Sequence, residues 1–174
     1  MKKAVIITGP GFEDVEVIYP YYRLLEAGFH VDIATKEAVD VNGKNGLVIK
    51  ASVDARSLQE KDYQLVVIPG GHEAPDRVRQ IKEVLSFIRD MNKKNKIIAA
   101  VCHGPWVLIS AGIMKGKKAT CYKGCKDDLI NAGAVYSDEE VVVDNNIITS
   151  PHFRTMPAWM RQVLNKFNTA AKIK

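Results

Sequence analysis

Six short runs of apolar and β-branched residues recur along the chain, and segments with helical spacing lie between them. The runs are continuous rather than alternating, which is typical of strands buried on both faces of a sheet. They predict strands over residues 4–8, 31–35, 65–68, 97–101, 140–143 and 147–149. The segments between them predict helices over residues 15–27, 77–94, 105–114, 126–132 and 158–167. This alternation indicates an α/β protein with a parallel sheet flanked by helices.

Glycines mark the ends of several predicted helices. Gly28, Gly112 and Gly133 each follow a helical run, at the position where a left-handed cap is favoured. Residues 41–54, with the Asn42-Gly43 pair inside them, predict a hairpin rather than a helix. Because no repeat, low-complexity tract or linker interrupts the pattern, we expect one domain over residues 1–174.

Composition limits the classes of protein to which this chain could belong. The chain has 174 residues, of which 47% are hydrophobic and 26% charged, as in an ordinary globular protein. The net charge of +5 raises the question of a nucleic-acid partner, but the lysines are scattered and no stacking aromatics alternate with them. No apolar run suits a signal peptide or a membrane span, so we expect a cytoplasmic protein without nucleic-acid or membrane partners.

Three cysteines, Cys102, Cys121 and Cys125, form an odd set without a CxxC pair. This spacing indicates neither a disulfide framework nor a structural zinc site, so we expect no metal and at least one free thiol.

Acidic residues follow the first predicted strand. Gly9, Pro10 and Gly11 are similar to a dinucleotide-binding loop, but the third glycine is missing, and Glu13, Asp14 and Glu16 would repel a phosphate. Asp14 is interpreted as a helix-capping residue. Glu13 and Glu16 lie three residues apart on one helix face, so one or both could point into a site at the strand ends.

The third and fourth strands end on chemically distinctive residues. Gly70-Gly71 allows close approach of unblocked backbone amides, as in an oxyanion hole, although a tight turn explains the pair equally well. Asp76 stands where the N-cap of the helix over residues 77–94 is expected.

The strand over residues 97–101 runs into Cys102, His103 and the Gly104-Pro105 pair, which favours a sharp strand-to-helix turn. A thiol there sits at a helix N-terminus that stabilises the thiolate, in the manner of a nucleophile elbow. His103 is the candidate base if its ring folds back across the turn. The alternative is an inert core cysteine.

Several segments together resemble the PfpI family of intracellular cysteine proteases, within the glutamine-amidotransferase-like superfamily that includes the parkinsonism-associated protein deglycase. The motifs are GFEDVEVIYPYYRL, PGGHEAPDRVR, AAVCHGPW, KDDLINAGA and EVVVDNNIITS, and the similarity runs from Lys2 to about Phe167. The resemblance implies a flavodoxin-like three-layer sandwich with a mostly parallel central sheet and a nucleophile elbow.

The resemblance also implies roles for individual residues. Cys102 matches the nucleophile and His103 its partner, while the amides of Gly71 and His103 match an oxyanion hole. Glu16 best matches the glutamate that contacts the thiol, with Glu13 one turn away. Tyr122 matches a residue that lines the pocket.

The third acid of the triad matches Asp76 and would come from a neighbouring subunit, so we expect a homodimer, or alternatively a hexamer, with a shared site. The GGHEAPD loop is one residue longer than the usual family form, which makes Glu73 an alternative. After Ser150 the family often has arginine, whereas this chain has Pro151 and His152, with Arg154 further on. His152 is thus an extra candidate base or an exposed loop residue.

We therefore expect a cofactor-free cysteine hydrolase that acts on peptides or on methylglyoxal-type adducts in a stress response. A protonated Glu16 would donate a hydrogen bond to the thiolate, whereas an ionised one would raise the pKa of the thiol. The alternatives are a non-catalytic redox-sensing or chaperone protein that uses an oxidisable Cys102, and an FMN carrier. The aromatic and apolar residues from Ile18 to Tyr22 favour an oligomer, unless their helix is buried on both sides.

Overall fold

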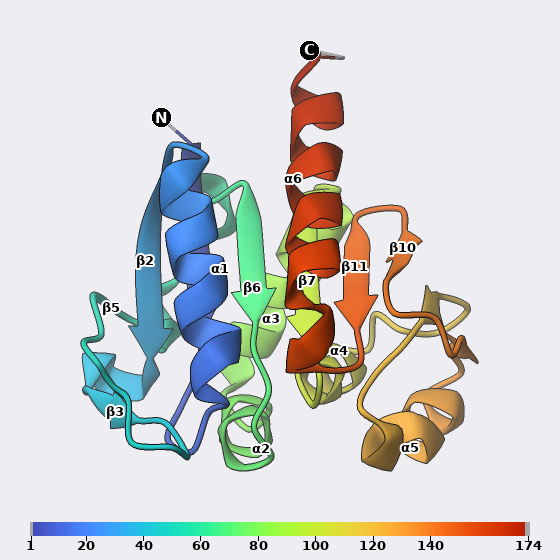
Figure 1. The fold of residues 1–174 in the computed structure, drawn as a ribbon, viewed down its shortest axis with the longest axis horizontal. Coiled ribbons are helices and arrows are strands. Elements are labelled where there is room, and N and C mark those ends of the chain that lie inside the picture. The colour runs from blue at the N-terminus through green and yellow to red at the C-terminus, as the bar shows by residue number, and fades with distance from the viewer. Residues whose placement is uncertain (1, 173–174) are drawn as a thin grey trace.

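A seven-stranded central sheet organises the computed structural model, which describes residues 2–172 (Figure 1). The strand order is β10-β11-β7-β6-β1-β2-β5, and β10 runs antiparallel to its neighbour β11 while the other neighbours pair in parallel. All six predicted strands are present in this sheet. The strands are β1 (Lys2–Ile7), β2 (Phe29–Thr35), β5 (Val53–Asp54), β6 (Leu65–Ile68), β7 (Ile97–Val101), β10 (Val142–Asp144) and β11 (Ile147–Ser150).

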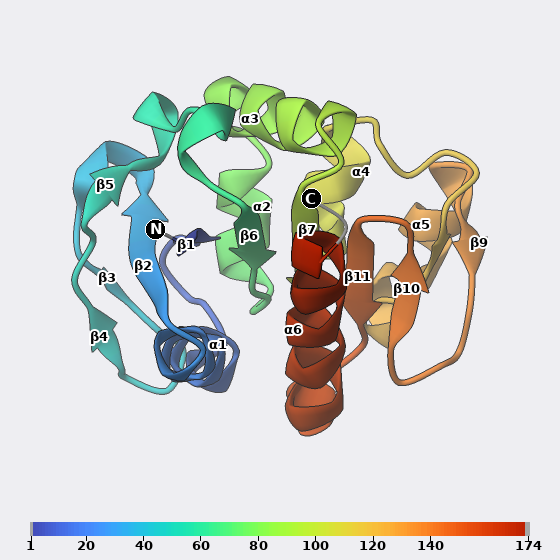
Figure 2. The ribbon, with the colours of Figure 1, turned by 90° about the horizontal axis from the view of Figure 1, so that it is seen from above.

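Helices cover both faces of the sheet, which gives the expected three-layer sandwich (Figure 2). One face carries α1 and α6, and the other carries α2, α3, α4 and α5. The helices are α1 (Asp14–Glu26), α2 (Glu73–Val78), α3 (Lys82–Lys93), α4 (Pro105–Ser110), α5 (Lys126–Asn131) and α6 (Met156–Lys172). No helix in residues 2–172 is both long and apolar enough to cross a membrane.

The continuous apolar strands supply two separate cores. In β1, Val5 and Ile7 join the core under α3 and α4, while Ala4 and Ile6 join the core under α1 and α6. Successive side chains of a strand point to opposite faces, so a strand buried on both sides needs apolar residues at every position. This is why the runs do not alternate.

One predicted helix is wrong in its extent. The segment 77–94 spans the last residues of α2, which starts earlier at Glu73, and all of α3, because the chain leaves helical geometry at Ile81, whose side chain is buried in the core. Asp76 lies inside α2 and caps neither helix, since the N-cap positions belong to His72 and Ile81. The predicted N-cap role of Asp76 is therefore wrong.

Two short strand pairs lie outside the main sheet. The predicted hairpin is confirmed by β3 (Val41–Asn42) and β4 (Val48–Ile49), which pair antiparallel. The parallel pair β8 (Lys118–Ala119) and β9 (Val135–Tyr136) was not predicted, because two-residue strands leave no periodic pattern. Short 3₁₀ helices complete the chain at Lys36–Ala38, Ala55–Ser57, Glu60–Asp62, Lys123–Cys125 and Phe153–Thr155.

The register of the parallel strands brings three loops to one edge of the sheet. Ile6 pairs with Val67 across β1 and β6, and Ile68 pairs with Ala100 across β6 and β7. The loops after β1, β6 and β7 therefore start side by side at the carboxyl edge, where ligands of open parallel sheets bind.

Candidate active site

Cys102 occupies a strained turn between β7 and α4. Its φ is +59°, in the left-handed region that side chains other than glycine rarely adopt. The surrounding backbone holds this conformation, since the Cys102 amide donates to the Ser150 carbonyl at 2.9 Å and the Cys102 carbonyl accepts from the Tyr122 amide at 2.9 Å. This is the geometry of a nucleophile elbow, as predicted.

Two glycines allow the loops to close around this turn. A Cβ atom at Gly104 would collide with the Ile68 carbonyl oxygen, so the elbow can approach β6 only with glycine there. A Cβ atom at Gly70 would lie 2.6 Å from the Cys102 Cβ and 2.6 Å from Glu16 Oε2. Gly70 therefore brings the thiol and the Glu16 carboxyl together.

Glu16 is fully buried although it lies on the first turn of α1. One carboxyl oxygen, Oε2, accepts a hydrogen bond of 2.6 Å from the Gly70 amide, and the other, Oε1, has no partner among the described residues. Burial, opposed by the Gly70 hydrogen bond, raises the pKa of Glu16 from 4.5 to about 7. An unpartnered buried oxygen is tolerated better in a neutral carboxyl group than in a carboxylate.

The Cys102 thiol experiences opposing influences. Burial and the negative charge of an ionised Glu16 raise the pKa of Cys102, whereas the backbone amides of Gly71 and His103 hydrogen-bond to the sulfur and lower it. These amides, expected to form an oxyanion hole, thus face the sulfur itself in the free protein. The helix α4 is only six residues long, so its dipole contributes little. The amides of Gly71 and His103 are therefore the main source of positive potential at the sulfur.

Glu16 and Cys102 form a coupled pair within hydrogen-bonding reach. If Glu16 and Cys102 were both ionised, their two buried negative charges would repel each other. The pair therefore keeps one proton over a wide pH range. Burial and the charge of an ionised Glu16 outweigh the two amides, so the pKa of Cys102 is raised while Glu16 is ionised. Protonation of Glu16 would remove that negative charge and would supply a hydrogen-bond donor to the sulfur.

His103 folds back across the turn toward the thiol. Its Nδ1 lies 3.2 Å from the Cys102 sulfur, although neighbouring side chains usually diverge. The ring stacks on Tyr122 at a centroid distance of 4.7 Å and meets the edge of Trp106 at 5.0 Å. Burial, with smaller contributions from the nearby His72 and Lys44, lowers the pKa of His103, so its ring is neutral near pH 7 and able to accept a proton.

Aromatic side chains continue outward from His103. Tyr122 lies between His103 and His152, whose centroid is 6.3 Å from that of Tyr122, and Phe153 packs against His152 at 4.1 Å. His152 is thus a half-buried part of the wall rather than a freely exposed residue, and burial lowers its pKa. Arg154 is exposed, and its amide donates to His152 Nδ1 at 3.3 Å.

The other two acids of the first loop bind the hairpin between β3 and β4. Glu13 is buried and forms a salt bridge with Lys44, which follows the Asn42-Gly43 pair. Asp14 accepts hydrogen bonds from the amides of Asn45 at 3.0 Å and Leu47 at 2.8 Å. Asp14 stands in the first turn of α1, where its carboxylate favours the helix dipole as predicted, and the same carboxylate also anchors the hairpin.

Lys44 is a residue of this site that the sequence did not indicate. Its charge acts on Glu13, Glu16 and Cys102. The hairpin reaches the site because the Lys44 amide donates to the Phe12 carbonyl at 2.9 Å. This long-range contact has no local pattern in the sequence, where Lys44 is one lysine among many.

The two candidates for the third acid do not reach His103 within one chain. Asp76 accepts hydrogen bonds from the side chain of Gln80, and Glu73 forms a salt bridge of 2.7 Å with Arg77. In residues 2–172 the His103 ring has no carboxylate hydrogen-bond partner. Neither acid is therefore assigned to the site by the single chain.

Cys102, Cys121 and Cys125 are all free and buried. The described part of the chain contains no group of three or more His, Cys, Asp or Glu side chains arranged to hold a metal ion. This edge of the sheet brings together a thiol, a carboxyl group, an imidazole and backbone amides.

Known proteins are similar to this chain over most of its length. A deglycase of Pyrococcus horikoshii is 44% identical over 160 residues, which cover 92% of this chain and 96% of that protein. Protein/nucleic acid deglycase 2 of Escherichia coli is 36% identical over 168 residues, which cover 94% of this chain and 96% of that protein. A Bacillus subtilis relative, YraA, is named as a candidate cysteine protease and is 38% identical over 165 residues, covering 94% of this chain and 97% of its own.

Solved structures agree with the fold. A two-domain protein of Anabaena variabilis with DJ-1/ThiJ/PfpI-like and ferritin-like domains matches 97% of this chain and 48% of its own length, with a TM-score of 0.94 and 35% identity. The DJ-1beta protein of Drosophila melanogaster matches with a TM-score of 0.86 and 29% identity over 93% of this chain and 88% of its own. The DJ-1/PfpI family profile covers residues 2–166. The chain therefore belongs to the DJ-1/PfpI family.

Proposed function

We propose that this protein is a cysteine-dependent hydrolase that removes methylglyoxal-type adducts, as the names of its deglycase relatives suggest. One observation carries the proposal: the sulfur of Cys102, held at a strained elbow, faces the buried carboxyl of Glu16, the His103 ring and two backbone amides. We further propose that it works in the cytoplasm without a cofactor.

In the first step the Cys102 thiolate attacks the carbonyl or hemithioacetal carbon of the adduct, and a carbon–sulfur bond forms. For a carbonyl, the electron pair of the carbon–oxygen double bond moves onto the oxygen. The amides of Gly71 and His103 are placed to stabilise that charge, since they already face the sulfur. His103, neutral and 3.2 Å from the sulfur, accepts the proton of the Glu16–Cys102 pair and donates it to the leaving group as the bond between that group and the adduct carbon breaks. Water then releases the product from Cys102.

The narrow approach to the thiol favours a small reacting group. Only 8% of the Cys102 surface is exposed, and His103, Tyr122 and Trp106 pack beside it. A compact aldehyde-derived adduct on a protein side chain or nucleotide needs less room than an extended peptide backbone. This burial also excludes water, which strengthens the interaction of the amides with a developing negative charge.

Peptide hydrolysis is the second candidate function. It would use an acid from another chain, since the His103 ring has no carboxylate partner among the described residues. The family resemblance supplies that acid from a neighbouring subunit, at the position of Asp76 or, alternatively, Glu73. Both acids are solvent-accessible on or near α2, so a partner subunit could approach them. A cleft built from two subunits would admit a peptide.

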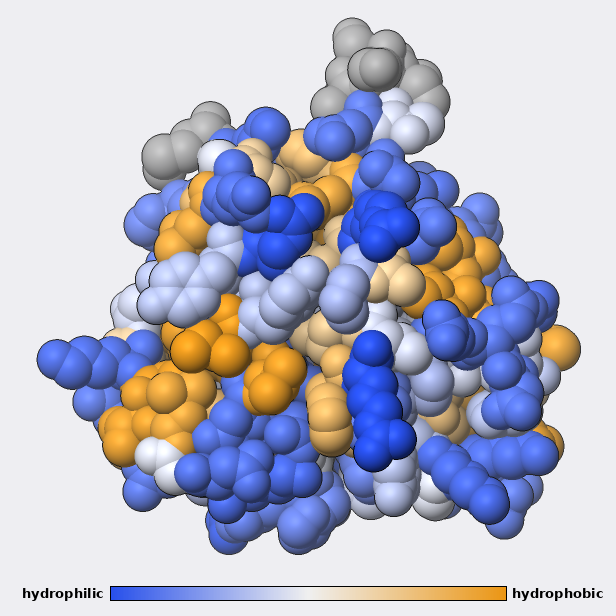
Figure 3. Space-filling view, in the orientation of Figure 1, coloured by the Kyte–Doolittle hydropathy of each residue, from blue (hydrophilic) through white to orange (hydrophobic). Residues whose placement is uncertain are grey.

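The surface of α1 supports self-association. Val15, Ile18 and Tyr22 are exposed on this helix, with 39% of Ile18 and 61% of Tyr22 accessible, and they line a shallow apolar hollow. Hydrophobic side chains gather on the face of the molecule that carries α1 (Figure 3). We therefore propose that the protein forms a homodimer, or alternatively a hexamer.

The decisive experiment compares wild type with Cys102→Ala for methylglyoxal consumption, for release of adducts from a glycated peptide, and for cleavage of an unmodified peptide. The proposal predicts that wild type releases adducts and that the variant loses this activity by at least about a thousandfold, as expected when a nucleophile is removed. Equal rates in both proteins would reject the hydrolase. Oxidation of Cys102 by peroxide without any turnover would instead favour the redox-sensing alternative.

A further inference from the structure

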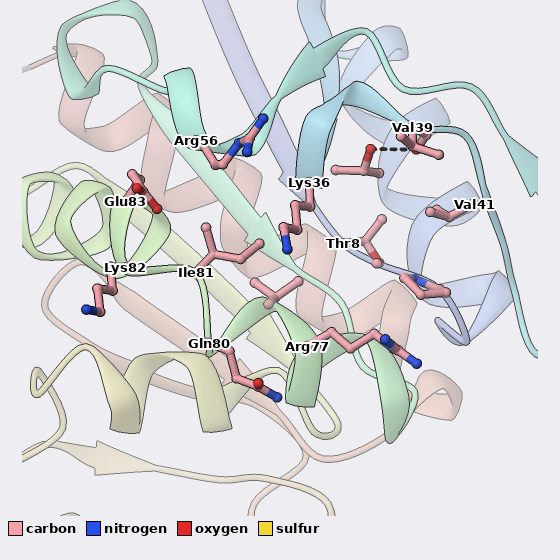
Figure 4. A pocket seen from close by; sticks show the side chains of 14 residues that line it. Thr8, Lys36, Val39, Val41, Arg56, Arg77, Gln80, Ile81, Lys82 and Glu83 are labelled. Atoms are coloured by element: carbon pink, nitrogen blue, oxygen red, sulfur yellow. Dashed lines mark hydrogen bonds between the residues drawn. The ribbon is translucent and has the colours of Figure 1, made fainter.

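A second cavity, of about 640 Å³, lies between the loops after β1 and β2 and the segment that joins α2 to α3 (Figure 4). Its volume is within the range of small-molecule sites. None of Glu16, Cys102 and His103, all within the described part of the chain, lines it. The cavity is therefore separate from the candidate active site.

Positive charge predominates around this cavity. The lining contains four cationic residues and one acidic residue, Lys36, Arg56, Arg77, Lys82 and Glu83. Arg56 and Arg77 have carboxylate partners outside the cavity, whereas Lys36 and Lys82 form no salt bridge within residues 2–172. Lys36 extends its ammonium group into the cavity in Figure 4, while Lys82 points away from its centre.

Thr8 gives the second, independent indication of a ligand. Its side chain lines the cavity (Figure 4), only 2% of its surface is exposed, and its Oγ1 has no hydrogen-bond partner among the described residues. A buried hydroxyl without a partner costs about 1 to 3 kcal/mol, so such groups are rare unless they serve a ligand. The neighbouring Thr35 differs, because its hydroxyl donates to the Val39 carbonyl at 2.6 Å.

The start of α3 adds backbone donors to the same wall. Ile81, Lys82 and Glu83 line the cavity, and the N-cap residue Ile81 has no side chain that could accept from the first-turn amides. The first amides of a helix lack partners inside the helix and attract anions. Lys82 at the first helical position adds positive charge where the helix dipole is already positive.

We propose that this cavity binds a small molecule that carries a phosphate group. The three terminal oxygens of a phosphate monoester can accept hydrogen bonds from the Lys36 ammonium, the Thr8 hydroxyl and an α3 amide or the Arg56 guanidinium at once. A carboxylate has only two oxygens and one negative charge. Val39, Val41, Val78 and Ile81 line the rest of the cavity and would contact an apolar part of the ligand.

The test is calorimetric titration of the whole protein with inorganic phosphate, glycerol 3-phosphate and acetate at constant ionic strength. We expect saturable binding of both phosphates, with acetate at least about tenfold weaker. Lys36→Gln and Thr8→Val should each weaken phosphate binding by about tenfold, the effect of one charge-assisted hydrogen bond. Lys93→Gln is the matched control, since it removes the same charge at the far end of α3.

The variant Thr8→Val distinguishes an effect on phosphate binding from an effect on folding. The hydroxyl that it removes has no partner in the free protein, so the melting temperature should stay equal or rise while phosphate binding weakens. Absence of saturable phosphate binding to wild type would overturn the proposal. So would an unchanged affinity in Thr8→Val, or acetate binding as tight as phosphate. Cys102→Ala should bind phosphate like wild type, so this outcome does not depend on the proposed hydrolase.

Discussion

At the scale of single residues, the important interaction is the one between Glu16 and Cys102. A carboxylate next to a thiol normally prevents its ionisation, yet the burial of Glu16 raises the pKa of the carboxyl group to about 7. A proton on Glu16 would remove this negative charge and would make the carboxyl group a donor to the sulfur.

The buried Glu16 makes stability depend on pH. Its pKa in the folded protein, about 7, exceeds the value of 4.5 for the unfolded chain, so the folded state holds the proton more tightly. The stabilisation is complete below about pH 4.5 and is lost as the pH rises through about 7. We expect the free energy of unfolding to fall by about 2 to 3 kcal/mol over this interval in wild type.

Glu16→Gln is the control for that prediction, because glutamine keeps the size of the side chain and cannot ionise. Urea unfolding at pH 4.5, 5.5 and 7 should show the decrease in wild type and a flatter profile in the variant. Parallel profiles in the two proteins would show that Glu16 ionises with an ordinary pKa.

The residues at the strand ends could be predicted from the sequence, but their contacts could not. Cys102 and His103 stand after an apolar run and before a Gly-Pro pair, which is a local signal. The contact of Glu16 with the Gly70 amide joins residues 54 positions apart, and the pairing of Glu13 with Lys44 depends on where the hairpin docks. The hydrogen bonds of Asp14 with the hairpin could not be predicted for the same reason.

At the scale of elements, the turn between β7 and α4 determines where the thiol points. Gly104 has an ordinary helical φ of −50°, so alanine would fit its backbone conformation. The restriction is instead the carbonyl of Ile68, which occupies the space of an alanine Cβ. The elbow is therefore held by close contact with β6 as well as by the strained φ of Cys102.

Gly104→Ala should lower the free energy of unfolding by about 3 kcal/mol, because the added methyl group must push the elbow away from β6. Cys102 alkylation should slow in the same variant, since the sulfur shifts from the amides of Gly71 and His103. Thermal or urea unfolding and alkylation kinetics measure the two effects.

Gly28→Ala is the matched control for Gly104→Ala. Gly28 has a φ of +79° and open space around it, so alanine there suffers only the left-handed backbone penalty of about 1 to 2 kcal/mol. The rate of Cys102 alkylation in Gly28→Ala should equal that in wild type. If Gly104→Ala were as stable as wild type, close packing of the elbow on β6 would not be a constraint.

Element types were predictable because the apolar pattern is strong in this sheet. The strands β1, β6, β7 and β11 each contain a continuous apolar run, as expected for burial on two faces. The break between α2 and α3 was not predictable, since helical spacing continues through Ile81 and only its burial in the core redirects the chain. Tertiary packing overrides local propensity there.

At the scale of the whole molecule, the exposed face of α1 and the incomplete hydrogen bonding of His103 lead to the same expectation. A surface with Ile18 and Tyr22 exposed is suited to contact with a second copy. The resemblance places the missing acid on such a copy. Assembly and activity would then be linked.

Ile18→Lys should weaken self-association, because it places a charge in the apolar hollow on α1. Light scattering over a range of protein concentrations should show a dimer or larger assembly for wild type and a smaller species for the variant. Ile130→Lys, which changes an exposed isoleucine of α5, serves as the control. A wild-type monomer with full peptidase activity would contradict the shared site.

The most direct test of the proposed chemistry is the rate of Cys102 alkylation by iodoacetamide between pH 4 and 10, with Cys121 and Cys125 replaced by alanine. If Glu16 carries the proton, wild type should show a midpoint at or below about 7, and Glu16→Gln should raise it by about one pKa unit, or about 1.4 kcal/mol, because an amide is the weaker donor. A wild-type midpoint above the ordinary thiol value of about 8.5 would show that the sulfur holds the proton and is not a ready nucleophile.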